Sequence, residues 1–337
     1  MRHRRSDPLL AFALLLAACS PAPSASPTVS VSPSASAVGL RPVTLLLGFR
    51  PDVQFAPFYL AQQAGYYADV GLEVSIEFKD GPDVLRLVAD GQAEFGVADA
   101  TDVMIGRSAG IPVKYISTLY DHFPVALIGT DGRVPAVPAE LVGERIGTPG
   151  RFGSSWHALL ALLDAGGLTA DDVKIREYPQ FNQVDGLLNG DVDLITGFRN
   201  NEPLRLAARG MAVEVLTVDE IAPLPGPGLI AGDALLAADP VLAGNFAGAT
   251  LRAQEAIAAN PQVGLDAAIA AVPAIGEDRA TALAVLKATV ELWGAGAGAP
   301  IDQAVWGRGY DTLRRLGFID GSVPLDQMTY DAIVRAL

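Results

Sequence analysis

The sequence PVTLLLGFRPDVQFAPFYLAQQAGYYADVGLEVSIEF, residues 42–78, decides the fold. It begins with the apolar run 43–47, which is typical of a buried strand. It ends with residues 74–78, where apolar and polar side chains alternate as in a strand with one exposed face. Residues 55–67 between them are predicted to form a helix. The stretch therefore predicts a strand, a helix and a second strand, which is the repeating unit of α/β folds.

Strands and helices keep alternating toward the C-terminus. Apolar residues after Gly81 form one face of a helix, and residues 95–97 return to strand. A second series of strands and helices occupies residues 145–208. The last third differs, because apolar residues recur at helical spacing across 283–293 and 301–316. We therefore expect two α/β lobes followed by a helical tail.

The chain is expected to cross between the two lobes twice. The first crossing is predicted at the GTDG sequence 129–132, and the return through the proline-rich stretch 223–227. This places 41–128 and 227–337, with its C-terminal helices, in lobe one, and 133–222 in lobe two. Two crossings form a hinge, and ligands prefer the cleft between domains that a hinge joins.

The N-terminus has the features of an export signal. Three arginines within the first five residues precede the apolar stretch 9–18, and the chain's single cysteine, Cys19, follows directly. This order resembles the lipobox of bacterial lipoproteins, which implies a signal peptide over 1–18 and a lipid on Cys19. The alternative is a buried free cysteine in a cytosolic protein. Residues 19–40, rich in Ser and Pro, are expected to tether the body to the extracytoplasmic face of the cell membrane.

Composition excludes several classes of function. The chain has 337 residues and a formal charge of −14, which argues against binding nucleic acid. A single cysteine rules out an intrachain disulfide, and the three histidines, His3, His122 and His157, offer little to a metal. We expect a monomer that uses no metal, cofactor or nucleic acid.

Several short motifs occur in a fixed order along the chain. They are APFYLA at 56–61, AGYY at 64–67, VGLEV at 70–74, ADGQAEFG at 89–96, AGIPV at 109–113, LVGERIG at 141–147 and NNEP at 200–203. Together they resemble the solute-binding proteins of ABC importers, in the family that includes nitrate, sulfonate and thiamine-pyrimidine binders, over about residues 41–270. The resemblance implies a two-lobed, type II periplasmic-binding-protein-like fold with a hinge and a ligand cleft. It also implies a membrane permease and an ATPase as partners.

Three glycines within these motifs have a structural interpretation. Gly65, Gly71 and Gly91 stand where helices end or turns begin, positions that favour positive φ. We expect them to shape the backbone rather than to contact a ligand.

Candidate ligand-binding residues follow from the predicted strands. In open α/β lobes, ligands bind at the carboxyl ends of strands, where aromatic rings stack on a ligand and polar groups bind its edge. Several of the same residues have a structural alternative, as helix caps or core. By family resemblance, Glu202 faces the nitrogen donors of the ligand. The candidates are Asp52, Gln54, Phe55, Phe58, Asp99, Thr101, Tyr120, Phe152, Ser154, Asn201 and Glu202.

The ligand is expected to be a neutral heteroaromatic ring. The cleft offers chiefly Arg50, Arg151 and Arg199 as cations, which is few for a sulfonate or nitrate in so acidic a chain. Binders of the pyrimidine precursor carry a Trp and a His that residues 49–57 lack. PDVQFAP at 51–57 is similar instead to the riboflavin-binding lipoproteins of flavin importers. We therefore expect riboflavin, with a thiamine pyrimidine precursor as the alternative.

An enzyme is the rival hypothesis, because the chain also resembles the pyrimidine synthases of thiamine biosynthesis. Those enzymes use a lysine-bound pyridoxal phosphate, a histidine and a Cys-rich motif. The only cysteine here is Cys19, and no lysine lies in a candidate loop. The sequence therefore favours a binding protein. Its lysines are Lys79, Lys114, Lys174 and Lys287.

Overall fold

A computed structural model describes residues 39–79, 81–294 and 300–332. These belong to one unit, Gly39–Leu337. The expected signal peptide, Cys19 and all but the last two residues of the expected tether lie outside the described residues. Among the described helices, none is long and apolar enough to cross a membrane.

The first sheet has the strand order β2-β1-β3-β10-β4. β1 pairs in parallel with β2 and β3, and Val43 lies opposite Val74. β10 runs antiparallel to both of its neighbours. This sheet and the helices packed on it are called lobe one. Its strands are β1 (Arg41–Leu47), β2 (Leu72–Phe78), β3 (Phe95–Ala98), β4 (Val113–Thr118) and β10 (Gly228–Gly232).

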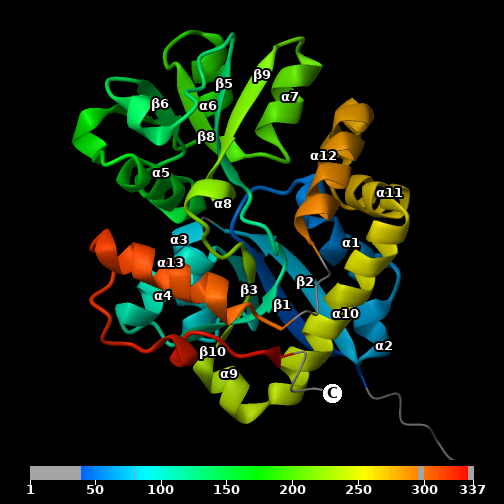
Figure 1. Cartoon of the computed structure of the whole chain (residues 1–337). Helices are drawn as coiled ribbons and strands as arrows, with labels where there is room; N and C mark the ends of the chain where they lie inside the picture. The colour runs from blue at the N-terminus through cyan, green and yellow to red at the C-terminus, as the bar shows by residue number, and fades with distance from the viewer. Residues whose placement is uncertain (1–38, 80, 295–299, 333–337) are drawn as a thin grey trace, which may run out of the picture. The chain divides into compact units, whose positions relative to one another are not determined.

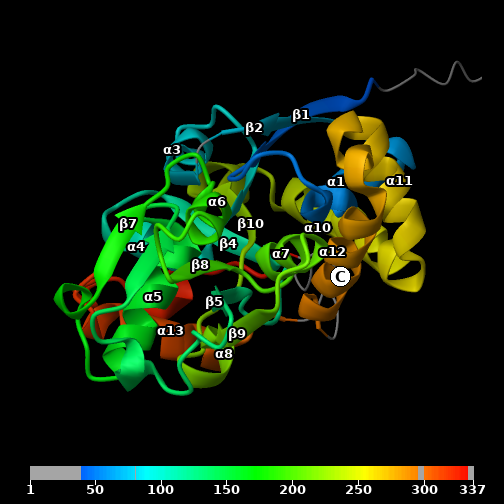
Figure 2. The ribbon, with the colours of Figure 1, turned by 90° about the horizontal axis from the view of Figure 1, so that it is seen from above.

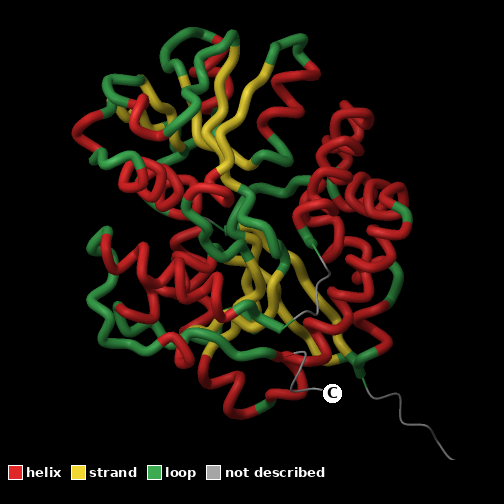
Figure 3. Tube along the Cα trace, viewed as in Figure 1, coloured by secondary structure: helices red, strands yellow, loops and turns green. Residues whose placement is uncertain are grey.

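The second sheet repeats this arrangement in the order β7-β6-β8-β5-β9. β6 pairs in parallel with β7 and β8, while β5 runs antiparallel to β8 and β9. This sheet and its helices are called lobe two, and the strands form two separate groups in Figures 1 and 3. The two-lobed α/β fold is therefore as expected. The strands are β5 (Val125–Thr130), β6 (Arg145–Thr148), β7 (Lys174–Glu177), β8 (Leu194–Phe198) and β9 (Val213–Thr217).

The first crossing between the sheets lies earlier than expected. The chain leaves lobe one after β4 and enters β5, so residues 119–124 make the crossing and 125–128 belong to lobe two. Residues 129–132 instead end β5 and form its outer turn, closed by a hydrogen bond from the Arg133 N–H to the Thr130 carbonyl. Asp131 and Gly132 both have positive φ there, and a tight turn uses the same residue types as a linker. The return runs through 218–227, between β9 and β10.

The helix expected over 55–67 is divided by a glycine. It consists of a 3₁₀ turn, Val53–Phe55, followed by α1 (Ala56–Gln63) and α2 (Tyr66–Asp69). Gly65, between the two helices, has φ +77°, which the helical pattern alone did not show to be a break. The expectation of positive φ is confirmed for Gly65 and for the two glycines at 71 and 91.

The remaining helices cover the sheets and form the expected helical tail. α12 contacts α7 of lobe two, and α13 contacts α4 of lobe one; α7 and α12 lie side by side in Figure 2 as well. The tail therefore joins both lobes. The helices are α3 (Gly81–Ala89), α4 (Ala100–Ser108), α5 (Gly153–Ala165), α6 (Gln183–Leu188), α7 (Glu202–Ala208), α8 (Val218–Ile221), α9 (Asp233–Ala238), α10 (Pro240–Ala259), α11 (Pro261–Ala271), α12 (Arg279–Leu292) and α13 (Gln303–Arg315).

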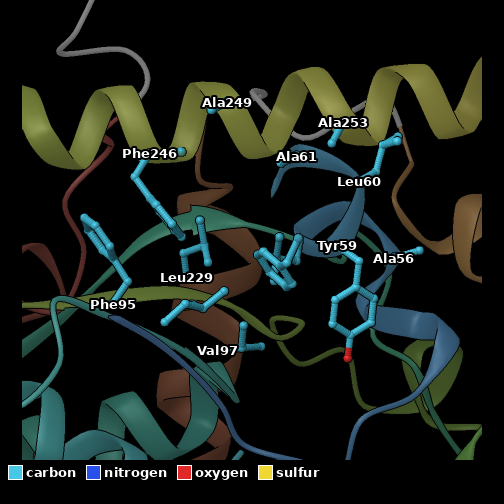
Figure 4. Close-up of a cluster of buried hydrophobic side chains, with 14 of the residues drawn as sticks. Ala56, Tyr59, Leu60, Ala61, Phe95, Val97, Leu229, Phe246, Ala249 and Ala253 are labelled. Carbon is cyan, nitrogen blue, oxygen red and sulfur yellow. The ribbon is translucent and has the colours of Figure 1, made fainter. Parts of the chain in front are cut away.

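Stacked aromatic rings pack α10 against the sheet of lobe one. The Phe246 ring lies 4.1 Å from Phe95 and 5.1 Å from Tyr67, nearly parallel to both. Figure 4 shows Phe246 pointing from α10 toward Phe95 and Leu229 of the sheet. Phe246 is fully buried, so its whole ring contributes to the core.

Removing this ring should destabilise lobe one. We expect Phe246→Ala to lower the free energy of unfolding by about 3–5 kcal/mol, because the buried cavity cannot fully collapse. Val241→Ala on the same helix is the control, since Val241 is 63% exposed. Chemical denaturation measures both variants, and equal effects would contradict this account of the core.

Candidate ligand-binding site

A pocket lies where strands of both sheets reach their carboxyl ends. Its walls come from the loops after β1, β3, β6, β7 and β8, together with the crossing segments near Tyr120 and Pro227. Parallel strands direct the loops that follow them to one edge of a sheet, which brings distant parts of the chain together. The pocket is therefore where the topology predicts a site.

Eight of the eleven expected ligand-binding residues line this pocket. They come from both lobes and from the crossing, and three of them are aromatic. Their contact with a ligand remains a prediction. They are Gln54, Phe55, Asp99, Tyr120, Phe152, Ser154, Asn201 and Glu202.

Three expected residues lie outside the pocket wall and have structural roles. The Asp52 carboxylate accepts from the Val53 N–H at 2.6 Å and pairs with Arg205 of lobe two at 2.8 Å. Phe58 is 1% exposed in the core. Thr101 is fully buried, and its hydroxyl lies 2.9 Å from Nδ1 of His157. Helical geometry explains why two of them are absent from the wall. Phe58 lies within α1 and Thr101 within α4, and both side chains point toward the core.

Sequence reasoning missed several residues of the wall. Asp102 lies three residues after Asp99, a spacing that places both at the start of α4, and this signal was available. Phe49, another of the missed residues, meets the ring of Phe181 edge to face across the lobes at 4.9 Å. Phe181 has φ +56°, an uncommon conformation for a non-glycine residue that no sequence pattern announces. Gln183 begins α6 and also lines the pocket.

A chain of hydrogen bonds across the lobes orients Gln54. The Arg205 guanidinium donates to the Asn201 side-chain oxygen at 2.5 Å. Because a guanidinium can only donate, this contact fixes which atom of the Asn201 amide is the oxygen and directs its nitrogen toward Gln54. That nitrogen donates to the Gln54 oxygen at 3.4 Å. The Gln54 nitrogen, which is buried and has no partner among the described residues, is left as a free donor in the pocket wall.

Two further buried polar atoms in the pocket wall lack a partner. The Gln183 nitrogen donates to the Thr196 carbonyl at 3.4 Å, which leaves its oxygen as a free acceptor. The Ser154 hydroxyl is also unpaired within the described chain, and both residues are 2% exposed. A buried polar group without a hydrogen bond is unfavourable by about 1–3 kcal/mol. A ligand that supplied these bonds would gain that free energy.

Glu202 is partly buried at the start of α7. Its carboxylate accepts a 2.8 Å hydrogen bond from the Phe198 N–H, and burial raises its pKa to about 6. A side chain at Gly197 would lie 2.9 Å from this carboxylate, so a glycine is needed there. Burial also raises the pKa of Asp99. The pKa of Asp102 is raised by burial and, in addition, by the negative charge of Asp99.

The described residues that line the pocket include no Arg, Lys or His. The expectation that Arg50, Arg151 and Arg199 supply its cations is therefore wrong. Arg151 pairs with Glu177 at 3.0 Å, and Arg199 lies 3.9 Å from Asp219. Arg50 stacks on the Phe49 ring. The described residues also hold no cluster of three metal-ligating side chains.

Aromatic rings, unpaired amides and carboxylates between two lobes define a ligand-binding protein of the two-lobed α/β kind. The chain belongs to the NMT1/THI5-like family, whose model matches residues 52–263. The E. coli periplasmic aliphatic sulphonate-binding protein SsuA has the same fold, with a TM-score of 0.68 at 13% identity over 86% of this chain and 92% of its own.

Curated relatives include binding proteins and enzymes. The riboflavin-binding protein RibY of Chloroflexus aurantiacus is 34% identical over 327 residues, 93% of each chain. A 4-amino-5-hydroxymethyl-2-methylpyrimidine phosphate synthase of Aspergillus parasiticus is 28% identical over 65% of this chain and 67% of its own. None of the four lysines lines the pocket. The identity to the riboflavin-binding protein therefore extends over more of the chain than the identity to the synthase.

His157 makes the folded protein sensitive to acid. It is 3% exposed, its ring lies against Phe318, and burial lowers its pKa to about 4. The unfolded chain binds its proton near pH 6.5, so this contribution to stability is lost as pH falls from about 6.5 toward 4.

We expect His157→Gln to reduce this loss by about 2 kcal/mol between pH 7 and pH 5, relative to the parent protein. Melting temperatures across that range measure the effect. His122→Gln is the matched control, because the His122 side chain is 53% exposed. Parallel pH profiles for the parent and His157→Gln would contradict the prediction.

Proposed function

We propose that this protein is the substrate-binding component of an ABC importer and that its ligand is riboflavin. The observation that carries the proposal is a pocket with aromatic walls, three unpaired buried polar atoms and no cationic side chain among its described lining. The riboflavin-binding relative, which shares 34% identity over 93% of this chain, supports it.

The chemistry of riboflavin matches the wall in two ways. Its flat ring system offers faces to aromatic side chains such as Phe152 and Tyr120. The uracil-like edge of that ring alternates acceptors with an N–H donor. The Gln54 nitrogen suits an acceptor, while Glu202 and the Gln183 oxygen suit a donor. A neutral ligand also needs no buried cation.

A membrane permease and an ATPase are the proposed partners. A lipid on Cys19 would hold the protein, as a monomer, at the extracytoplasmic face of the membrane, and the Ser/Pro-rich stretch after it would let the lobes reach the permease.

A thiamine pyrimidine precursor is the second candidate ligand. The synthases among the relatives favour it, because their products are of that class. An aminopyrimidine presents the same alternation of ring nitrogen and N–H donor to Glu202. It is smaller than riboflavin, however, and lacks the tricyclic ring.

Riboflavin titration tests the ligand. We expect saturable quenching of flavin fluorescence at micromolar or lower concentration, and Gln54→Ala to weaken binding about tenfold, because one hydrogen bond to a buried donor is lost. Gln92→Ala, at an exposed position, is the control. A thermal shift with an aminopyrimidine and no response to riboflavin would assign the pyrimidine precursor instead.

The pH dependence of binding tests the role of Glu202. An N–H donor bound to this carboxylate should lower its pKa below the free value of about 6, so that affinity falls as pH drops from 7.5 to 5. Glu202→Gln should bind more weakly at pH 7.5 and vary less with pH. Calorimetry at both pH values decides, and an unchanged slope in the variant would exclude this contact.

Cell fractionation tests the anchor. We expect Cys19→Ser to release the protein from the membrane fraction and to abolish incorporation of labelled fatty acid, because the variant lacks the sulfur that carries the lipid. A Ser20→Ala variant serves as the control. Labelled lipid on the Cys19→Ser variant would refute lipidation at this position.

A further inference from the structure

The protein's own carboxylates lie at the glycine-flanked turn, residues 150–155, that begins α5. Asp99 of lobe one accepts a 2.7 Å hydrogen bond from the Ser154 N–H of lobe two. The Gly153 N–H stabilises the Asp102 carboxylate and lowers its pKa, partly offsetting the effect of burial. Asp99 stands at the N-cap position of α4, yet its side chain makes no bond to that helix.

The backbone of the turn is shaped around these two carboxylates. Gly153 has φ +68°, and a side chain there would lie 3.0 Å from Oδ2 of Asp99 and 3.9 Å from Oδ2 of Asp102. Asp99 is the N-cap residue of α4 and Asp102 lies in its first turn, so the start of a single helix presents both carboxylates. The first N–H groups of a helix are its natural anion-binding groups.

We propose that Asp99 and Asp102 act as an internal anion that occupies the N-terminus of α5 when the lobes close, so that the pocket accepts an uncharged ring ligand and rejects its phosphate ester. The inference rests on the proposed function in one respect, that the ligand carries a ring.

Electrostatics makes this rejection strong. A phosphate entering the pocket would have to displace two carboxylates from the helix end and would also face Glu202, with no cation among the described lining residues to offset the repulsion. His157 lies beside the pair, with Nδ1 3.8 Å from Asp102, and burial keeps it neutral at physiological pH by lowering its pKa to about 4.

Lobe closure and ligand choice are coupled by the same contact. Asp99 and Asp102 belong to lobe one and α5 to lobe two, so this contact bridges the two lobes. A ligand that carried its own anion to this position would keep the carboxylates out and would prevent closure. Specificity then comes from a repulsive element as well as from attraction.

Three probes and three pairs of substitutions test the proposal. The probes are inorganic sulfate, followed by melting temperature, and the pair riboflavin and flavin mononucleotide, followed by fluorescence quenching. Asp99→Ala with Asp102→Ala frees the helix end, whereas Asp99→Asn with Asp102→Asn removes the charge and keeps an acceptor. Glu73→Ala with Asp326→Ala removes two exposed carboxylates outside the pocket wall and is the control for net charge.

We expect the parent protein to bind flavin mononucleotide at least about tenfold more weakly than riboflavin, and this ratio to fall in both aspartate pairs. Sulfate should raise the melting temperature of the alanine pair alone. Equal binding of the two flavins by the parent, or the same changes in the control pair, would overturn the proposal.

The sulfate measurement separates this inference from the proposed function. If the parent bound no riboflavin, the proposed ligand would be wrong, while a sulfate response confined to the alanine pair would still support the internal anion. An alanine pair that ignored sulfate would refute it. Should that pair fail to fold, Asp99→Ala alone, which frees the Ser154 N–H, carries the same measurement.

Discussion

Closing the two lobes takes carboxylates and amides out of water, and each of them then needs a partner. Some find one across the cleft: Asp52 pairs with Arg205, and Asp99 accepts from the Ser154 N–H. Others, the Gln54 nitrogen and the Gln183 oxygen, find none among the described residues. Buried polar groups without partners are unfavourable, so a ligand that supplied the missing bonds would stabilise this arrangement of the lobes. The same hydrogen bonds would then contribute both to the affinity for the ligand and to the stability of this arrangement.

The topology puts the hinge and the pocket in the same place. Each sheet contains three neighbouring parallel strands and a strand that runs antiparallel to one of them, β10 in lobe one and β5 in lobe two. These two strands are also the ones reached by the crossings. Residues next to a crossing, such as Tyr120 and Pro227, therefore line the pocket, and a rotation of the lobes changes the pocket directly.

The charged side chains in and around the pocket are carboxylates in the wall and arginines paired outside it. The carboxylates that line it are partly buried, and the nearby arginines are paired elsewhere, Arg205 with Asp52 and Arg151 with Glu177. A helix end that elsewhere would attract an anion is occupied from within the molecule by Asp99. The net negative charge of the chain is thus accompanied by a pocket whose described lining holds carboxylates and no cationic side chain.

The sequence by itself determined the alternation of strands and helices, the two lobes, the family and the loops that form the pocket. These depend on local periodicity and on glycines such as Gly65 and Gly71, whose effects act within a few residues. Only the tertiary structure decided which side chains in those loops face the pocket. Asp52 pairs with Arg205 and Thr101 contacts His157. These partners lie 153 and 56 residues away in the sequence, so no local pattern could show them. A sequence pattern specifies where a loop begins, whereas the direction of its side chains depends on which distant groups the fold brings within hydrogen-bonding distance.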